Sequence, residues 1–391
     1  MAKSAIQDTQ LAPQHVRELE TNLRKLWNLG ANLLVGWRIL PQGIEVLYIP
    51  SYNLPLAAKS RPDILRPNRH ITDSGEFEEL VKLGCRKASI GLMFRVTEKG
   101  GEIDEINEII RNYTVTHFES RAVALFDIVS FSVYSPYEQI TQLSILSYYI
   151  KLVAQRCRSL NMPISVCMTT TGDGFYVWNR HEGLSADITL FCVVMLTLGN
   201  IYATRKLVDR DITSVPRLRA AVHFGSHYEY YEGGGGRADA SGYIVGDVTI
   251  ILARLLSKAR TGQLLIGSHL RRFGEADAEW RERLGVDEID TPMFLALAQS
   301  QFAKLSGLPI PGGKIESVKA HLTGPRVSED TLSIRKYYVS DKHGLDHQCY
   351  NARLSINTSS NELVSFGLLD DDLEKFDARS DENEDIILKI R

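Results

Sequence analysis

The chain has 391 residues, more than one hydrophobic core usually supports, so two or three domains are expected. Hydrophobic residues make up 44% and charged residues 24%, and the net charge of −3 is too small to indicate a nucleic-acid surface. The five cysteines are scattered and form no C-x-x-C pair, which favours reduced thiols over a disulfide framework or a zinc site.

The most apolar stretch of the chain is 188–198 (ITLFCVVMLTL). It is shorter than the roughly 20 residues that a membrane span needs, so we expect a buried helix. The N-terminus lacks the apolar segment of a signal peptide. A cytoplasmic protein without a membrane anchor is therefore predicted.

Residues 1–115 form a first region of unknown role, because no chemical motif occurs in it. Periodicity and turn residues predict a helix at 15–33, a strand at 44–49, an irregular proline-rich connection at 51–70, a helix at 77–84 and a strand at 89–96.

Residues 116–275 alternate between strand and helix patterns. The expected strands are 122–128, 165–171, 173–178, 218–225 and 263–266, and the expected helices are 135–160, 185–205 and 246–259. The order β-α-β-β-α-β, with additions, predicts an α+β protein with a ferredoxin-like core.

Residues 276–312, rich in Ala, Gln, Pro and Gly, are expected to be a linker. Residues 313–391 are expected to form a small C-terminal α+β domain with strands at 334–339 and 350–356. This domain ends in an acidic tail that we expect to be a solvated surface.

Two aspartates stand out in the second region. Asp127 ends an apolar strand, where an ionised carboxylate is costly to bury without a partner, and Asp173 lies between two glycines in a hairpin turn. In a ferredoxin-like sheet both aspartates could lie at the same end. Two carboxylates and the oxygens of a triphosphate are a normal ligand set for Mg²⁺ or Mn²⁺. The alternative is a strand-end cap and a plain turn, but the spacing of 46 residues with one long helix between favours the metal site.

Five motifs resemble, in order, those of the class III nucleotidyl cyclases (the adenylate and guanylate cyclase type). They are FDIVSFS at 126–132, TGDGFY at 171–176, AVHFG at 221–225, GDVTIILAR at 246–254 and GQLLIGS at 262–268. This resemblance implies a homodimer with active sites at the interface.

The resemblance also implies roles for individual residues. Asp127, Asp173 and the backbone carbonyl of Ile128 would bind two Mn²⁺ or Mg²⁺ ions per active site. Arg254 would reach the triphosphate from the other subunit, because its fixed fork of donors matches phosphate oxygens. The reaction would be attack of the ribose 3′-hydroxyl on the α-phosphorus, with release of pyrophosphate.

Three positions depart from the purine cyclase pattern. Thr169 and Tyr243 stand where that family carries its adenine-reading lysine and aspartate, and Ile250 replaces a transition-state asparagine. A hydroxyl and a phenol could hydrogen-bond a smaller base, so a changed base preference is our interpretation. Tyr134, at the start of the first long helix, is a further candidate near the nucleotide, although it could equally pack against the sheet.

The segment 336–353 (KYYVSDKHGLDHQCYNAR) resembles the C-terminal sensor domain shared by some cyclases and bacterial nucleotidyltransferases. Its Asp341, His343 and His347 could form a metal cluster or, as we favour, a polar turn. Cyclases with such a sensor occur in the antiphage systems of the Pycsar family, which make cyclic UMP or cyclic CMP.

The predicted function is therefore a pyrimidine nucleotide cyclase that converts UTP to cyclic UMP as a second messenger of antiphage defence. A separate cyclic-nucleotide-binding effector is the implied partner, and no nucleic-acid or membrane partner is expected. The alternatives are a cytidylate cyclase that uses CTP, an adenylate or guanylate cyclase with an atypical base pocket, and a catalytically inactive nucleotide-binding sensor.

Overall fold

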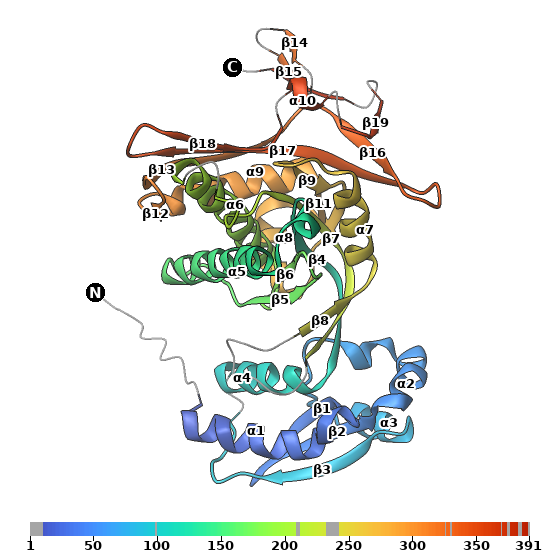
Figure 1. Cartoon of the computed structure of the whole chain (residues 1–391). Helices are drawn as coiled ribbons and strands as arrows, with labels where there is room; N and C mark the ends of the chain where they lie inside the picture. Colours follow the sequence, from blue (N-terminus) through green and yellow to red (C-terminus); the bar gives the residue numbers. More distant parts are fainter. Residues whose placement is uncertain are drawn as a thin grey trace, which may run out of the picture. The chain divides into compact units, whose positions relative to one another are not determined.

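The structure is a computed structural model that describes residues 11–97, 100–208, 212–231, 242–324, 326–328, 331–368, 370–373, 376–381 and 385–389. The chain divides into two compact units (Figure 1). Unit 1 holds Met1–Phe118 and Tyr228–Val245, and unit 2 holds Glu119–His227 and Gly246–Arg391. This division differs from the expected boundary at residues 115 and 116, because a later hairpin belongs to unit 1.

Unit 1 is built on an antiparallel sheet of β1 (Asn32–Leu40), β2 (Gly43–Pro50) and β3 (Arg86–Gly91), in that order. Apolar side chains point to both faces of these strands, so both faces need a cover. The helices α1 (Pro13–Trp27) and α4 (Gly100–Ile110) pack on one face. The other face is covered by α2 (Leu54–Ser60), η3 (Pro62–Leu65) and α3 (Ser74–Lys82).

The expectation of an irregular connection at 51–70 is wrong. Residues 51–65 instead form η2 (Ser51–Asn53), α2 and η3. Two of the three prolines that suggested a loop, Pro55 and Pro62, lie in the first turns of α2 and η3, where the missing N–H costs nothing. The side chains of Leu54 and Ile64 are buried in the core of unit 1, which stabilises these short helices.

A hairpin of β7 (Leu218–Tyr231) and β8 (Gly242–Val245) joins unit 1 through the end of β7. Glu229 is fully buried there, and its carboxylate accepts hydrogen bonds from Arg111 at 3.2 Å and from the Tyr231 hydroxyl at 2.5 Å. Arg111 belongs to η4 (Arg111–Tyr113), after α4. This buried charge pair ties the hairpin to the helices of unit 1.

Unit 2 contains the alternating elements that the sequence predicted. They are β4 (Val115–Ile128), α5 (Pro136–Ser159), β5 (Val166–Thr170), β6 (Gly174–Asn179), α6 (Leu184–Leu207), β7, α7 (Asp247–Lys258) and β9 (Leu264–Gly267). The sheet order β9-β7-β4-β6-β5 places β6 between β4 and β5, and β4 between β6 and β7. Two βαβ units are thus split and interleaved, which confirms the ferredoxin-like α+β core.

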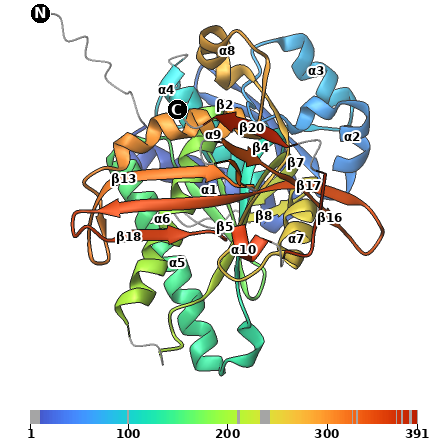
Figure 2. The ribbon, with the colours of Figure 1, turned by 90° about the horizontal axis from the view of Figure 1, so that it is seen from above.

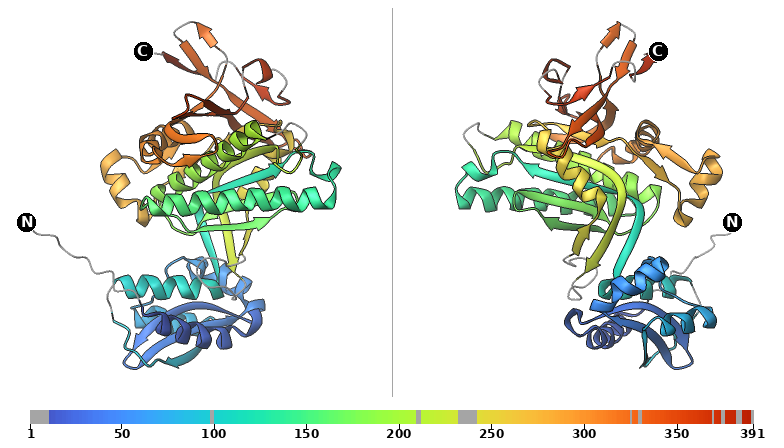
Figure 3. Two further views of the ribbon diagram at one scale, coloured as in Figure 1. Left: turned by 60° about the vertical axis from the view of Figure 1, so that its left-hand side comes forward. Right: turned by 90° about the vertical axis from the view of Figure 1, so that its right-hand side faces the viewer.

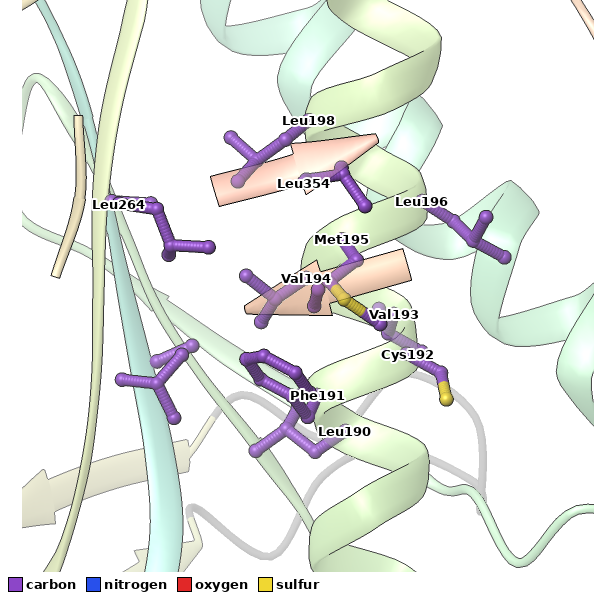
Figure 4. Packing of buried hydrophobic residues seen from close by; sticks show 14 of the residues in the cluster. Leu190, Phe191, Cys192, Val193, Val194, Met195, Leu196, Leu198, Leu264 and Leu354 are labelled. Carbon is purple, nitrogen blue, oxygen red and sulfur yellow. The ribbon is translucent and has the colours of Figure 1, made fainter. Parts of the chain in front are cut away.

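Helices α5 and α6 pack side by side (Figure 3). The apolar stretch at 188–198 lies in α6 and is buried against the sheet and the C-terminal strands, as the labelled Phe191, Leu264 and Leu354 illustrate (Figure 4). Among the described residues α6 alone is long and apolar enough to cross a membrane, but 94% of its apolar window is buried inside the protein. It is therefore the expected core helix.

The segment 276–312, expected to be a linker, is folded and packed in unit 2. With the preceding residues it forms β10 (Leu270–Arg272), η6 (Glu275–Asp277), α8 (Ala278–Leu284), β11 (Glu288–Asp290), α9 (Thr291–Gln301), η7 (Phe302–Leu305) and β12 (Pro309–Ile310). Buried Arg271 donates to Asp187 of α6 at 2.8 Å and to Asp277 at 2.6 Å. Phe294 and Phe302 pack around Phe191, so apolar contacts and a buried ion network hold this segment to α6.

Most of the C-terminal strands extend the sheet of unit 2, whereas β14 (Arg326–Ser328), β15 (Thr331–Ile334) and β20 (Ile386–Lys389) form a separate three-stranded sheet. The strand β17 (Asp346–Thr358) pairs with β9, β13 (Gly313–Leu322), β16 (Lys336–Ser340) and β18 (Leu363–Phe366) (Figure 2). The remaining described elements are α10 (Asp370–Leu373) and β19 (Arg379–Ser380). Pairing between Tyr350 and Ile266 joins the C-terminal strands to the ferredoxin-like core.

Replacing the buried carboxylate of unit 1 tests the role of the hairpin. Glu229→Gln should lower the free energy of unfolding by about 3 kcal/mol, because it removes the buried member of the two carboxylates, Glu108 and Glu229, that pair with Arg111. The exposed Glu119→Gln is the control and should change stability by less than about 0.5 kcal/mol. Urea unfolding measures both, and equal midpoints for the two variants would contradict this role of Glu229.

Candidate active site

The end of β4 lies directly against the turn between β5 and β6. Asp127 pairs with Gly174 across the two strands, and the Ile128 amide donates to the Asp173 carbonyl at 2.9 Å. A Cβ at Gly174 would lie 1.9 Å from the Phe126 carbonyl oxygen, so only glycine permits this approach. The two aspartates predicted from sequence therefore belong to neighbouring strand ends of one sheet.

The turn that carries Asp173 is fixed by its own hydrogen bonds. The Thr171 amide donates to the Gly174 carbonyl at 3.0 Å, and the Thr171 hydroxyl contacts the Asp173 carboxylate at 3.3 Å. Gly172 adopts a φ of +100°, which disfavours other residues. Both glycines of the G-D-G motif are thus required by the backbone.

Sequence reasoning missed Arg219, the basic residue beside this pair. Its Nε donates to Asp127 Oδ2 at 2.6 Å, and its Nη1 donates to the Ala259 carbonyl at 2.8 Å. Arg219 lies on β7, next to β4 in the sheet, and Ala259 follows the last residue of α7. The guanidinium therefore links the carboxylate at the end of β4 to the end of α7.

The electrostatics of Asp127 reflect this setting. Burial is the main cause that raises the pKa of Asp127 above its ordinary value, and the neighbouring charge of Asp173 raises it further. The hydrogen bond and positive charge of Arg219 oppose these effects but do not overcome them. Folding thus makes ionisation of Asp127 more costly than in the unfolded chain, and a further bound positive charge would lower that cost.

The donor set fits a divalent cation that also binds a phosphorylated ligand. Within the described part of the chain no group of three or more His, Cys, Asp or Glu side chains surrounds a common point. Two carboxylates, Asp127 and Asp173, are what the site offers, and Mg²⁺ is often bound by one or two carboxylates together with substrate phosphates. Ile128 is the buried last residue of β4 and directly follows Asp127. Its backbone carbonyl remains a proposed ligand.

Arg254 lies on a helix of unit 2, and Tyr134 lies in the short extended connection before another helix of the same unit. Arg254 is on α7, with one third of its side chain exposed, and its Nε lies 3.7 Å from Asp341 Oδ2. No contact joins Arg254 to Asp127 or Asp173 among the residues that the structure describes. Tyr134 precedes the N-cap Ser135 of α5, is partly exposed, and accepts a hydrogen bond from Gln139 on its carbonyl.

The two predicted base-reading residues belong to different units. Thr169 lies on β5 opposite Tyr176, and the Tyr176 hydroxyl donates to the Thr249 carbonyl of α7 at 2.9 Å. Tyr243 lies on β8 of unit 1, where its half-exposed ring stacks at 6.2 Å on Tyr230.

Ile250, at the position of the absent asparagine, is 53% exposed on α7. An apolar side chain so exposed on a helix contributes little to the core of unit 2. Tyr176, close to this end of α7, is a second residue that sequence reasoning overlooked, because its place opposite Thr169 depends on strand register.

The segment Asp341, His343 and His347 has the contacts of a polar turn, the alternative that we favoured. Asp341 Oδ1 accepts the amides of His343 and Leu345 at 2.8 and 3.0 Å. Asp341 Oδ2 lies 3.5 Å from His347 Nε2. These bonds close the turn between β16 and β17.

No protein-family model matches the chain. No curated protein matches it either. Among solved structures, similar chains include the catalytic core of a rhodopsin-guanylyl cyclase with converted specificity in complex with ATPalphaS (14% identity, TM-score 0.35, 61% of this chain and 97% of that chain). The adenylyl cyclase CyaB from P. aeruginosa is another (10% identity, TM-score 0.33, 61% and 95%).

A third similar structure is the guanylate cyclase domain of RhGC from Catenaria anguillulae in complex with GTP (15% identity, TM-score 0.33, 61% of this chain and 97% of that chain). Likenesses at such low identity and TM-score carry no argument about activity. The assignment of the core rests on the strand order of unit 2.

The raised pKa of Asp127 gives a prediction about stability. A carboxyl whose pKa is raised by folding stabilises the fold below its unfolded pKa, and this contribution is lost as pH rises through the folded pKa. The asparagine of Asp127→Asn is neutral at every pH, so it keeps the stabilising contribution of an uncharged side chain at this position. At pH 7 the metal-free variant should therefore unfold at or above the unfolding temperature of the wild type.

The same variant should lose stabilisation by Mn²⁺, which in the wild type would reach about 2.7 kcal/mol at 100 times the Kd. Calorimetric scans with and without Mn²⁺ measure both effects, and exposed Asp104→Asn is the control. A marked loss of metal-free stability in Asp127→Asn would mean that the pair with Arg219 is structural.

Proposed function

We propose that this chain is a homodimeric pyrimidine nucleotide cyclase that converts UTP to 3′,5′-cyclic UMP and pyrophosphate. The observation that carries the proposal is the placement of Asp127 beside the turn of Asp173, on a sheet of interleaved βαβ units. The same chain carries Thr169 and Tyr243 where purine cyclases carry their adenine-reading pair.

The reaction forms a bond between the ribose 3′-oxygen and the α-phosphorus. The bond from that phosphorus to the oxygen that bridges to the β-phosphorus breaks, pyrophosphate leaves, and the hydroxyl proton passes to solvent. Asp127 and Asp173, with the Ile128 carbonyl, would hold two Mn²⁺ or Mg²⁺ ions. When bound, such ions lower the pKa of the attacking hydroxyl and neutralise charge on the leaving group.

The chain's own residues position the nucleotide. Arg254 of the partner subunit would bind the triphosphate, since its planar fork matches phosphate oxygens. Tyr134 lies beside the N-terminus of α5, where the helix dipole favours anionic groups. Arg219 holds one oxygen of Asp127 and so limits the directions in which that carboxylate can bind a cation.

The proposed base preference rests on Thr169 and Tyr243. A hydroxyl and a phenol can both donate and accept hydrogen bonds, which suits the edge of a uracil or a cytosine. Tyr243 also adds volume where a purine would need room. UTP is the proposed substrate and CTP the nearest alternative.

We further propose that the product is a second messenger of antiphage defence in the cytoplasm. This rests on the resemblance of 336–353 to a cyclase-associated sensor segment. On this proposal residues 313–391 sense the activating signal, and a separate protein with a cyclic-nucleotide-binding domain receives the product.

The first prediction concerns the product. Incubation of the pure protein with each nucleoside triphosphate and Mn²⁺, followed by mass spectrometry, should give cyclic UMP as the main product. Asp127→Asn and Asp173→Asn should each abolish it, because each removes a charged ligand. Cyclic AMP or cyclic GMP as the main product would refute the pyrimidine preference, and nucleotide binding without any cyclic product would refute catalysis.

The second prediction concerns the shared site. Asp127→Asn and Arg254→Ala homodimers should both be inactive, yet mixed dimers should regain one working site of two. Activity after mixing and subunit exchange should therefore rise from near zero to at most about a quarter of the wild-type value, since half the dimers are mixed at equal amounts. If no activity returns while mixed dimers form, Arg254 does not act across the interface.

A further inference from the structure

The turn between β16 and β17 faces α7 across an open pocket in unit 2. Arg254 and Lys258 line the pocket from α7, and Asp341 and Lys342 line it from the turn. At the rim Lys258 pairs with Asp377. The C-terminal strands thus place an acidic side chain beside the arginine of α7.

Asp341 is held rigidly in this position. One carboxylate oxygen accepts the amides of His343 and Leu345, and its backbone amide donates to the Leu345 carbonyl at 2.9 Å. Gly344 adopts a φ of +77°, which lets the turn close. Only 5% of the Asp341 side chain is exposed, so the second oxygen has a fixed direction.

The turn is also connected to the strand that follows α7. The strand that follows it, β17, pairs with β9, where Cys349 is opposite Gly267. The strand β9 follows α7 and pairs with β7 as well. The backbone hydrogen bonds of one sheet therefore place the strand after Asp341 beside the strand after α7.

The guanidinium of Arg254 faces the Asp341 carboxylate with its Nε edge. Its Nε is buried, has no hydrogen-bond partner among the described residues, and lies 3.7 Å from Asp341 Oδ2. That separation is too long for a hydrogen bond and short enough for charge attraction. The described contacts leave the Nη atoms of Arg254 uncommitted, and these atoms form the fork that can bind a phosphate.

Burial acts to raise the pKa of Asp341, but the amide hydrogen bonds from Leu345 and His343 outweigh it and lower that pKa. The carboxylate is therefore charged at neutral pH. Its charge attracts the Nε edge of Arg254. One third of the Arg254 side chain remains exposed to solvent.

We propose that Asp341 is a positioning residue for Arg254: it holds the Nε edge so that the Nη fork points toward a triphosphate. This inference rests on the proposed cyclase function, in which Arg254 binds the substrate. It gives the C-terminal strands a direct part in the active site, because removal of the turn would leave Arg254 without its anchor.

The charge-removing variant Asp341→Asn tests the proposal, because an amide oxygen can still accept the two turn amides. Turnover should fall by roughly tenfold to 100-fold, since misplacement by about 1 Å can cost that much. Mn²⁺ binding should not change. Asp377→Asn, which removes an exposed carboxylate at the same pocket, is the matched control and should keep wild-type activity.

Combination variants separate positioning from a general structural defect. Turnover is already near zero in an Arg254→Ala background, so the readout there is UTP affinity, which Asp341→Asn should not lower further. Mixed dimers provide the turnover test of Asp341→Asn. This variant should be complemented by Asp127→Asn subunits but not by Arg254→Ala subunits, because Asp341 and Arg254 serve the same half-site. Wild-type activity in Asp341→Asn, a rise in activity, or complementation of Asp341→Asn by Arg254→Ala subunits would overturn the proposal.

A measurement that does not depend on turnover separates the test of the positioning role from the test of the cyclase function. The ¹⁵Nε–H resonance of Arg254, assigned by its loss in Arg254→Lys, should shift in Asp341→Asn and not in Asp377→Asn. If the wild type makes no cyclic product while the resonance shifts as expected, the contact stands and the cyclase function fails. If the resonance does not respond, the positioning role itself is wrong.

Discussion

The close approach between the end of β4 and the β5–β6 turn is the constraint on which the candidate site depends. A side chain at Gly174 would collide with the Phe126 carbonyl, so glycine lets the two backbones meet and brings Asp127 next to the turn of Asp173. Burial raises the cost of ionising Asp127, and the neighbouring charge of Asp173 adds to that cost. One arginine offsets part of that cost, and bound cations would offset the rest.

Much of unit 2 could be predicted from sequence because its signals are local. Apolar periodicity identified α5, the apolar run at 188–198 identified α6, and glycines around Asp173 identified the turn. Arg219 could not be found in this way, because an arginine within a strand becomes informative only when the neighbouring strand and its register are known. Tyr176 was missed for the same reason.

Other expectations were wrong where the composition of a segment suggested a loop but its apolar side chains are buried. Prolines suggested a loop at 51–70, yet two of the three occupy first turns of short helices whose apolar side chains are buried. The segment 276–312 looked like a linker, but Phe294 and Phe302 anchor it to α6. The hairpin of β7 and β8 belongs to unit 1, where its Glu229 accepts a hydrogen bond from Arg111. These two residues are 118 positions apart in the sequence, so no local pattern predicts their contact. The pairing of β17 with β9, which joins the C-terminal strands to the core, could not be predicted from sequence either, because the two strands are far apart in the chain.

The central claim is that Asp127 and Asp173 together hold two cations with a nucleotide. Electron paramagnetic resonance of the protein with Mn²⁺ and a non-reactive UTP analogue tests it most directly. The account predicts two Mn²⁺ per chain with the spin coupling of ions about 4 Å apart, a separation typical of two-metal sites. Asp127→Asn and Asp173→Asn should each abolish the coupling. A coupled pair of ions that persists in both variants would contradict the account.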